Sequence, residues 1–171
     1  SFLANQEKKE WDRLPYRNLK VGVMGLGVLG AHCASHLAEL GFETYGYSRT
    51  EKSIEGVTCY SGEQRNEFLQ DLDVLVNLLP VTPYTESILN AELYAEMKKG
   101  AYLINVARGN HLVEEDLLDS IDNDHLSGAL LDVFRGEPLP KENPLWAHPK
   151  VTITPHVASV SLPESVLKLL K

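Results

Sequence analysis

The sequence has little cysteine, a deficit of positive charge and no long apolar run. Its 171 residues include two cysteines, Cys33 and Cys59, which are too few for a disulfide framework and indicate a reducing compartment. No run approaches the ~18 apolar residues that a membrane span needs, and no signal peptide is visible. We therefore expect a cytoplasmic protein.

The charge balance excludes two classes of partner. The 16 Lys and Arg residues face 24 Asp and Glu residues, giving a formal net charge of -8, whereas nucleic acids and anionic membranes call for a basic face. An anionic cofactor must therefore be held by local groups. The length allows one domain with a full core, but not a dinucleotide-binding domain plus a second domain of similar size.

A glycine-rich turn near the N-terminus is the most informative motif. An apolar run at 21–24 is typical of a buried strand, and it is followed by Gly25, Gly27 and Gly30 in the G-x-G-x-x-G spacing. Gly25 would allow a tight turn, Gly27 a close approach to a pyrophosphate, and Gly30 close packing of helix on strand. The free N-H groups of the following helix would bind the pyrophosphate.

The residues after the glycines predict that helix. Gly41 is placed to end the helix. Apolar side chains recur before it at helical spacing, at Leu29, Cys33, Leu37 and Leu40. Val28 and Leu29 stand between the second and third glycines, where we expect contacts with the cofactor. The context thus favours a dinucleotide-binding turn over an ordinary strand-to-helix turn.

Strands and helices alternate along the rest of the chain. We expect further strands at 43–47, 57–60, 73–79, 101–106, 126–133 and 151–154, helices at 63–69, 91–97 and 114–121, and an ordered loop at 137–149. This order is typical of an α/β fold with a doubly wound parallel sheet, the Rossmann arrangement.

Both ends of the chain indicate helices that continue elsewhere. Residues 1–14 predict part of an interdomain helix, residues 15–160 the dinucleotide-binding domain, and residues 161–171 the start of a return helix that opens with a capping box at Ser161. We expect more protein on both sides, so that a separate substrate domain is absent from this chain.

The end of the second predicted strand favours NADP(H) over NAD(H). No acid stands at this tip to bind a ribose 2'-hydroxyl, whereas Arg49 can clamp a 2'-phosphate. Ser48 and Thr50 can donate to the same phosphate, and Lys52 offers a second charge. The alternative is NAD, with Arg49 on the surface and Glu51 as an imperfect ribose ligand.

Three polar residues follow predicted strands at the edge where such sheets bind ligands. They are Arg108, Glu137 and His156. Their types suit reduction of a 2-oxo acid: Arg108 would hold the carboxylate and carbonyl, and His156 would supply the proton as general acid. Glu137 would pair with His156 and favour its protonated form.

Each of these three residues also has a non-catalytic interpretation. Arg108 could cap loop carbonyls, Glu137 could be a solvated carboxylate, and His156 a satisfied histidine after a strand. His32 and His36 lie four residues apart on one helix, but no third ligand is evident, so we expect no metal site.

Several segments in order resemble the D-2-hydroxyacid dehydrogenase family. They read GLGVLG at 25–30, NVARG at 105–109, LDVFRGEPLP at 131–140 and TPHVA at 154–158. The Ser48-Arg49 tip, LPVT at 79–82 and PLW at 144–146 resemble its glyoxylate/hydroxypyruvate reductase branch. The resemblance covers nearly the whole chain.

That resemblance implies the roles given above to Arg108, Glu137 and His156. It also implies that Asp132 lies near the nicotinamide carboxamide, and that further contacts with the cofactor come from Leu79, Pro80, Val106 and Ala107. Family members have a separate substrate domain and usually form a homodimer through the cofactor domain. A chain without that domain should bind cofactor yet turn over poorly.

Three functions therefore compete. The first is an NADPH-dependent reductase of small 2-oxo acids such as glyoxylate and hydroxypyruvate. The second is an NAD-dependent D-lactate or phosphoglycerate dehydrogenase, since most residues that shape the substrate pocket are missing. The third, from another class, is a dinucleotide-sensing, corepressor-like binding protein, against which the Arg49 clamp argues.

Overall fold

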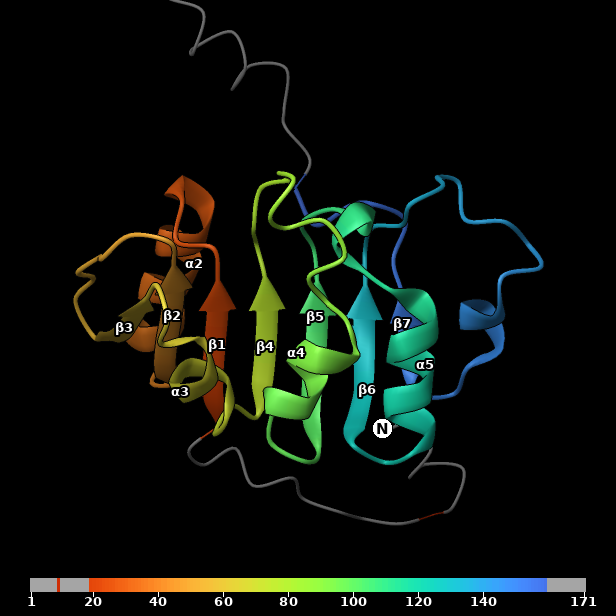
Figure 1. Cartoon of the computed structure of the whole chain (residues 1–171), viewed down its shortest axis with the longest axis horizontal. Helices are drawn as coiled ribbons and strands as arrows, with labels where there is room; N and C mark the ends of the chain where they lie inside the picture. The colour runs from red at the N-terminus through yellow and green to blue at the C-terminus, as the bar shows by residue number, and fades with distance from the viewer. Residues whose placement is uncertain (1–8, 10–18, 160–171) are drawn as a thin grey trace, which may run out of the picture.

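The computed structural model describes residue 9 and residues 19–159. The helices expected at 1–14 and 161–171 lie outside these residues, apart from Lys9, and so does the capping box at Ser161. The described residues form an α/β layer structure around a single seven-stranded sheet (Figure 1).

The sheet is parallel throughout. In chain order its strands are β1 (Lys20–Met24), β2 (Glu43–Ser48), β3 (Val57–Ser61), β4 (Val74–Asn77), β5 (Ala101–Asn105), β6 (Leu126–Leu131) and β7 (Val151–Ile153). Their spatial order is β3-β2-β1-β4-β5-β6-β7, so the winding reverses between β1 and β4. All carboxyl ends meet at the upper edge in Figure 1, and ligands bind such sheets at that reversal.

Helices cover both faces of the sheet. Behind it in Figure 1 lies α2 (Val28–Glu39), and in front lie α3 (Arg65–Leu69), α4 (Ala91–Glu96) and α5 (Glu114–Asp122). Each face buries its own apolar cluster, as the near-continuous apolar strands require. The predicted doubly wound Rossmann class is therefore confirmed.

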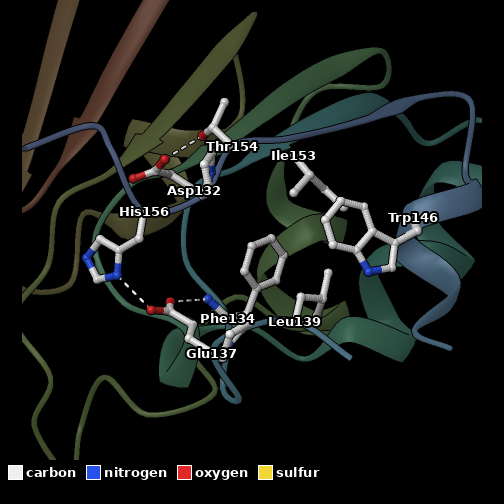
Figure 2. Close-up of a pocket in the computed structure, with 10 residues that line it drawn as sticks. Asp132, Phe134, Glu137, Leu139, Trp146, Ile153, Thr154 and His156 are labelled. Atoms are coloured by element: carbon white, nitrogen blue, oxygen red, sulfur yellow. Dashed lines mark hydrogen bonds and ion pairs between the residues drawn. The ribbon is translucent and has the colours of Figure 1, made fainter. Parts of the chain in front are cut away.

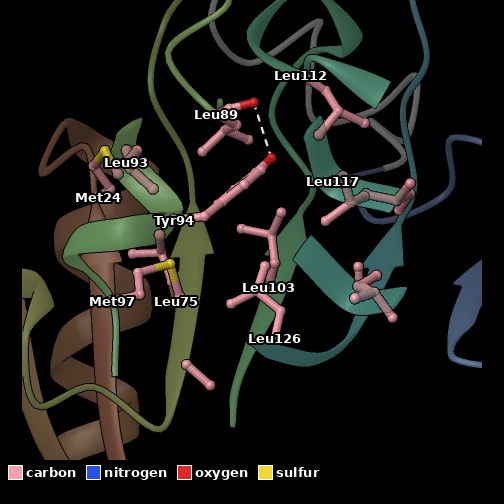
Figure 3. Packing of buried hydrophobic residues seen from close by; sticks show 14 of the residues in the cluster. Met24, Leu75, Leu89, Leu93, Tyr94, Met97, Leu103, Leu112, Leu117 and Leu126 are labelled. Carbon is pink, nitrogen blue, oxygen red and sulfur yellow. Dashed lines mark hydrogen bonds between the residues drawn. The ribbon is translucent and has the colours of Figure 1, made fainter. Parts of the chain in front are cut away.

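The larger cluster packs beneath α4 and α5 and is shown in Figure 3. Its largest buried side chain is Tyr94, only 1% exposed, whose hydroxyl donates to the Leu89 carbonyl at 2.9 Å. Burial raises the pKa of Tyr94 far above its usual value, so the ring serves as an uncharged core residue. Leu75 and Leu103 from adjacent strands pack around it (Figure 3).

Every strand and helix predicted within residues 19–159 is present, but several strands end earlier than expected. The strand expected at 73–79 stops at Asn77, and the one expected at 126–133 stops at Leu131. Apolar residues beyond these ends, such as Val133 at 0% exposure, stay buried while their backbone leaves the ladder. An apolar pattern indicates which residues are buried, not which residues form strand hydrogen bonds. Strands predicted from it therefore extend past their observed ends.

Two short 3-10 helices were not expected. One, η1 (Gly109–His111), follows β5, and the other, η2 (Pro144–Ala147), interrupts the loop predicted at 137–149. The η2 turn is capped by Asn143, whose side chain accepts from the Leu145 amide at 2.9 Å. Single turns of this kind are too short to produce a periodic signal.

The glycine turn has the predicted geometry. Gly25 has a φ of 108°, which a residue with a side chain rarely adopts. A β-carbon at Gly30 would lie 1.8 Å from the Gly25 carbonyl oxygen, whereas one at Gly27 would meet nothing within 4 Å. Gly41, with a φ of 91°, follows the end of α2 as expected.

The described part of the chain has no helix with the length and apolar character needed to span a bilayer. Cys33 and Cys59 are both free and partly buried within the cluster behind the sheet. Burial raises the pKa of the Cys33 thiol, as expected for one of the apolar positions of the helix.

Gly30→Ala should destabilise the fold, because its β-carbon would overlap the Gly25 carbonyl and push α2 away from β1. We expect a loss of about 1 to 3 kcal/mol in the free energy of unfolding, measured by urea denaturation. Gly27→Ala is the matched control and should unfold like the wild type. Equal stability of both variants would contradict the close contact.

Candidate active site

The three predicted catalytic residues follow three neighbouring strands at the carboxyl edge. Arg108 follows β5, Glu137 lies in the loop after β6, and His156 follows β7. Since these strands are adjacent and parallel, their exits open onto the same side of the sheet.

Glu137 and His156 form an ion pair. The Glu137 carboxylate lies 2.7 Å from His156 Nδ1 and also accepts the Phe134 amide at 2.8 Å (Figure 2). The bond to His156, assisted by that amide, holds the pKa of Glu137 below its usual value. An ionised carboxylate can only accept, so Nδ1 carries a hydrogen and Nε2 is the atom left to exchange a proton.

Asp132 anchors the segment that carries His156. Only 1% exposed, its carboxylate accepts the Thr154 hydroxyl and the amides of Val157 and Ala158, both at 2.9 Å. Burial by itself would raise the pKa of Asp132, but these hydrogen bonds outweigh it and hold the pKa below its usual value. Both carboxylate oxygens are thus engaged within the protein.

The backbone of His156 is strained. Its φ is 54°, in the left-handed region that non-glycine residues rarely occupy, although histidine is among those enriched there. The His156 amide donates to the Asp132 carbonyl at 2.9 Å, so Asp132 holds the histidine and the residues on both sides of it. Strain of this kind persists only where surrounding contacts fix the conformation, and it clusters at functional sites.

Arg108 lies at the same edge but is not joined to the ion pair. Its side chain is exposed, and its guanidinium donates to the Ala107 carbonyl at 2.6 Å. In residues 19–159 no hydrogen bond links Arg108 to Glu137 or His156. The remaining guanidinium donors are available to a carboxylate placed between the two loops.

Two contacts that the sequence did not reveal join the loops of this edge. A β-carbon at Gly109 would lie 1.9 Å from the Phe134 carbonyl carbon, so the loop of Arg108 touches the loop of Glu137. Arg135 donates to the Asn110 carbonyl at 3.1 Å and to the Ser87 hydroxyl at 2.7 Å. No local pattern distinguishes Arg135 from an ordinary surface arginine, so only the structure identifies it.

A cavity of about 660 Å³ lies beside the ion pair. Figure 2 shows His156 and Glu137 at one side and Trp146 and Ile153 at the other, with Phe134 between them. The lining is largely apolar, and Trp146 is 54% exposed. The ion pair therefore stands at the boundary between an apolar hollow and the open edge of the sheet.

Two groups of the predicted cofactor residues follow β1 and β4, the strands at the winding reversal, whereas Val106 and Ala107 follow β5 and Asp132 follows β6. Val28 and Leu29 in the first turn of α2 are 91% and 67% exposed, which is unusual for apolar side chains and leaves them available for contact. Leu79 and Pro80 follow β4, the strand beside β1. The helix N-terminus and the clear approach at Gly27 fit a pyrophosphate.

The tip of β2 carries four side chains that can donate hydrogen bonds, one of which already donates within the protein. Arg49, Thr50 and Lys52 are exposed, and none forms an ion pair within the described residues. The Ser48 hydroxyl donates to the Thr50 carbonyl at 2.7 Å, which orders the tip. That hydroxyl would have to turn before it could donate to a phosphate.

The part of the chain that the structure describes gathers no group of three or more His, Cys, Asp or Glu side chains able to hold a metal ion. The His32 and His36 rings do lie close together, with centroids 4.4 Å apart and planes tilted by 45°. His36 Nδ1 lies 3.1 Å from the His32 carbonyl oxygen, a contact within α2 itself.

Comparison with known proteins agrees with this geometry. The family model "D-isomer specific 2-hydroxyacid dehydrogenase, NAD binding domain" matches residues 2–158. The glyoxylate/hydroxypyruvate reductase A of Serratia proteamaculans is 48% identical over 166 residues, which cover 95% of this chain and 53% of that protein. The chain thus spans about half the length of this relative.

Two solved structures superpose closely on the chain. A D-isomer specific 2-hydroxyacid dehydrogenase from Xanthobacter autotrophicus, in complex with NADPH and MES, has a TM-score of 0.93 and 42% identity, covering 99% of this chain and 72% of that one. An NADPH-dependent glyoxylate/hydroxypyruvate reductase from Sinorhizobium meliloti, in complex with NADP and sulfate, has a TM-score of 0.90 and 41% identity, covering 98% and 55%.

Asp132→Asn should destabilise the chain, because an amide nitrogen would face backbone donors in place of a carboxylate oxygen. We expect the free energy of unfolding at pH 7 to fall by about 2 to 4 kcal/mol. Asp119→Asn, on the exposed side of α5, is the matched control.

The same variants test the pH dependence. The pKa of Asp132 is lowered from 3.8 in the folded state, so its stabilising contribution is present above about pH 4 and is lost as the pH falls through the folded pKa. Wild type should therefore lose more stability than Asp132→Asn between pH 5 and 2, by urea denaturation. Identical pH slopes would refute the anchoring role of this carboxylate.

Proposed function

This chain belongs to the D-isomer specific 2-hydroxyacid dehydrogenase family, as its NAD binding domain, and we propose that it is the NADPH-binding half of a reductase that converts glyoxylate and hydroxypyruvate to their 2-hydroxy acids. The observation that carries the proposal is the Glu137–His156 ion pair at the carboxyl edge of the sheet. A proton donor there would lie at the same carboxyl edge of the sheet as the glycine turn after β1.

Each residue at this edge would perform one part of the reaction. Arg108 would hold the substrate carboxylate through its planar guanidinium, whose free donors match the two oxygens. His156 would release the Nε2 proton to the carbonyl oxygen as the hydroxyl forms, while Glu137 holds the ring by Nδ1. The nicotinamide, when bound, supplies the hydride.

The anchoring of His156 supports this assignment. Because Asp132 fixes the residues around His156, the imidazole keeps one orientation with little freedom to lose when substrate binds. Asp132 is also the residue proposed to lie near the nicotinamide carboxamide. Its carboxylate oxygens already accept three hydrogen bonds, so a further bond from the carboxamide would use a remaining lone pair.

NADPH is the proposed cofactor, with NAD as the alternative. The exposed Arg49 and Lys52 at the β2 tip would neutralise a 2'-phosphate, with Ser48 and Thr50 as further donors. The relatives from Xanthobacter and Sinorhizobium are described with NADPH and NADP. The pyrophosphate would lie at the start of α2, against Gly25, Gly27 and Gly30, with Val28, Leu29, Leu79, Pro80, Val106 and Ala107 around the cofactor.

The remaining proposals concern the whole protein. A substrate domain would be joined to the dinucleotide-binding domain, 15–160, through the helices expected at 1–14 and 161–171. We expect a cytoplasmic homodimer that pairs through the cofactor domain. Without its substrate domain, this chain should bind NADPH and turn over poorly. Of the two tests that follow, an NAD-dependent lactate or phosphoglycerate dehydrogenase would fail the first, and a dinucleotide sensor would fail the second.

Arg49→Ala should weaken NADPH binding by about 10- to 100-fold, because hydrogen bonds to a charged phosphate are lost, and leave NADH binding nearly unchanged. Both dissociation constants can be measured on this chain from nicotinamide fluorescence. Lys99→Ala, an exposed cation after α4, is the control. Equal losses for the two cofactors would overturn the NADP assignment.

His156→Ala in the complete enzyme should lower kcat for glyoxylate reduction by about 10²- to 10⁴-fold, the usual contribution of a general acid. NADPH affinity should stay within twofold of wild type. His148→Ala is the matched control, because His148 also contacts a carboxylate, that of Asp122 at 3.1 Å, but lies away from the site. Surviving activity in His156→Ala would place the proton donor elsewhere.

A further inference from the structure

A buried polar network lies directly beneath the loops of the candidate site. Asn77 ends β4, Asn105 ends β5 and His111 ends η1, and all three are 0% exposed. Asn77 Nδ2 lies 3.0 Å from Asn105 Oδ1 and 3.0 Å from His111 Nδ1. Nothing in the proposed reaction uses these side chains, yet the cost of burying them demands a reason.

Each member of the network also binds a loop backbone. Asn77 Oδ1 accepts the Leu79 amide at 3.2 Å, and His111 Nε2 lies 3.3 Å from the Pro80 carbonyl oxygen. Asn105 Oδ1 accepts the Ala107 amide at 3.3 Å, and its Nδ2 donates to the Arg108 carbonyl at 3.2 Å. The network thus joins the proposed cofactor loop after β4 to the proposed substrate loop after β5.

The backbone contacts determine the state of the histidine. A backbone amide can only donate, so the atom of Asn77 that faces Leu79 is its oxygen, and the atom that faces His111 is its amino nitrogen. That nitrogen donates, so His111 Nδ1 must accept. The Pro80 carbonyl can only accept, so Nε2 carries the hydrogen. His111 is therefore neutral, in a single tautomer.

We propose that His111 is a positioning residue that locks the cofactor loop at Leu79-Pro80 to the substrate loop at Arg108, so that the two ligands are held in a fixed relative placement. The inference rests on the proposed function. It assigns a role to a side chain that contacts neither ligand and acts only through Pro80 and the two asparagines.

Protonation would break the lock. A proton on Nδ1 would face the Asn77 amino group, so both groups would donate and neither accept. Burial lowers the pKa of His111, and the positive charge of Arg108 lowers it further against the raising effect of the Pro80 hydrogen bond. The lock should therefore hold above pH 6.5 and be lost as the pH falls through the lowered folded-state pKa.

His111→Leu in the complete enzyme removes both hydrogen bonds at similar volume. We expect kcat/KM for glyoxylate to fall about 10- to 100-fold at pH 7.5, the effect of a loop misplaced by about 1 Å, with a raised KM. The remaining activity should lack the acid-side loss that we expect of the wild type as the pH falls below 6.5 through the lowered pKa of His111. His111→Asn, which keeps an acceptor toward Asn77, should lose less and serves as the measurable variant if His111→Leu does not fold.

The control is His125→Leu. His125 Nε2 contacts the Tyr94 carbonyl at 2.6 Å, but at the opposite edge of the sheet, so its loss should lower stability and leave KM and the pH profile unchanged. If His111→Leu and His111→Asn change stability only, as His125→Leu does, the positioning role is wrong.

NADPH titration of the same variants separates this inference from the proposed function. His111→Leu should raise the dissociation constant for NADPH about 10-fold, since Leu79 and Pro80 lose their support, and this readout needs no turnover. A wild-type enzyme inactive on glyoxylate would defeat the proposed function while leaving this effect measurable. Unchanged NADPH affinity together with unchanged KM would defeat the inference.

Discussion

The parallel hydrogen-bonding of seven strands is the constraint on which the site depends. Because every strand runs the same way, each segment that leaves a strand does so at one edge, and residues more than 100 positions apart in the sequence share that edge. Gly25 leaves β1 there, and His156 leaves β7. No single loop has to supply all the residues of the site, because the sheet brings several loops to the same edge.

At that edge, contacts with backbone carbonyls and amides fix the positions of most of the loops. Asp132 holds the segment of His156 through amides, and Gly109 meets the Phe134 backbone so closely that no side chain could intervene. Buried carboxylates and amides are costly unless every polar atom is satisfied. In the described residues no buried side-chain nitrogen or oxygen lacks a partner, which is consistent with a rigid edge.

The sequence predicted the fold better than it predicted the contacts that support the carboxyl edge of the sheet. Glycine spacing predicted the tight turn between β1 and α2, because the requirement for close backbone contact is expressed locally, as the clash at Gly30 illustrates. The pairing of Glu137 with His156 followed from residue types at strand ends. The placement of Asp132 near the nicotinamide carboxamide stays a prediction. Its bonds to Thr154 and to the amides of Val157 and Ala158 were not predicted, because they depend on β6 and β7 being neighbours, which no local pattern encodes.

The separation of the β2 tip from the β5–β7 edge has an evolutionary consequence. Arg49 directly follows β2, a strand two positions away from β4 in the sheet, on the other side of the winding reversal from His156. Under the proposed function, the residues that select the cofactor can therefore change without any change at the residues proposed for catalysis. Substitutions at this one turn could then convert an NADH-dependent enzyme into an NADPH-dependent one during evolution, with the residues at the β5–β7 edge unchanged.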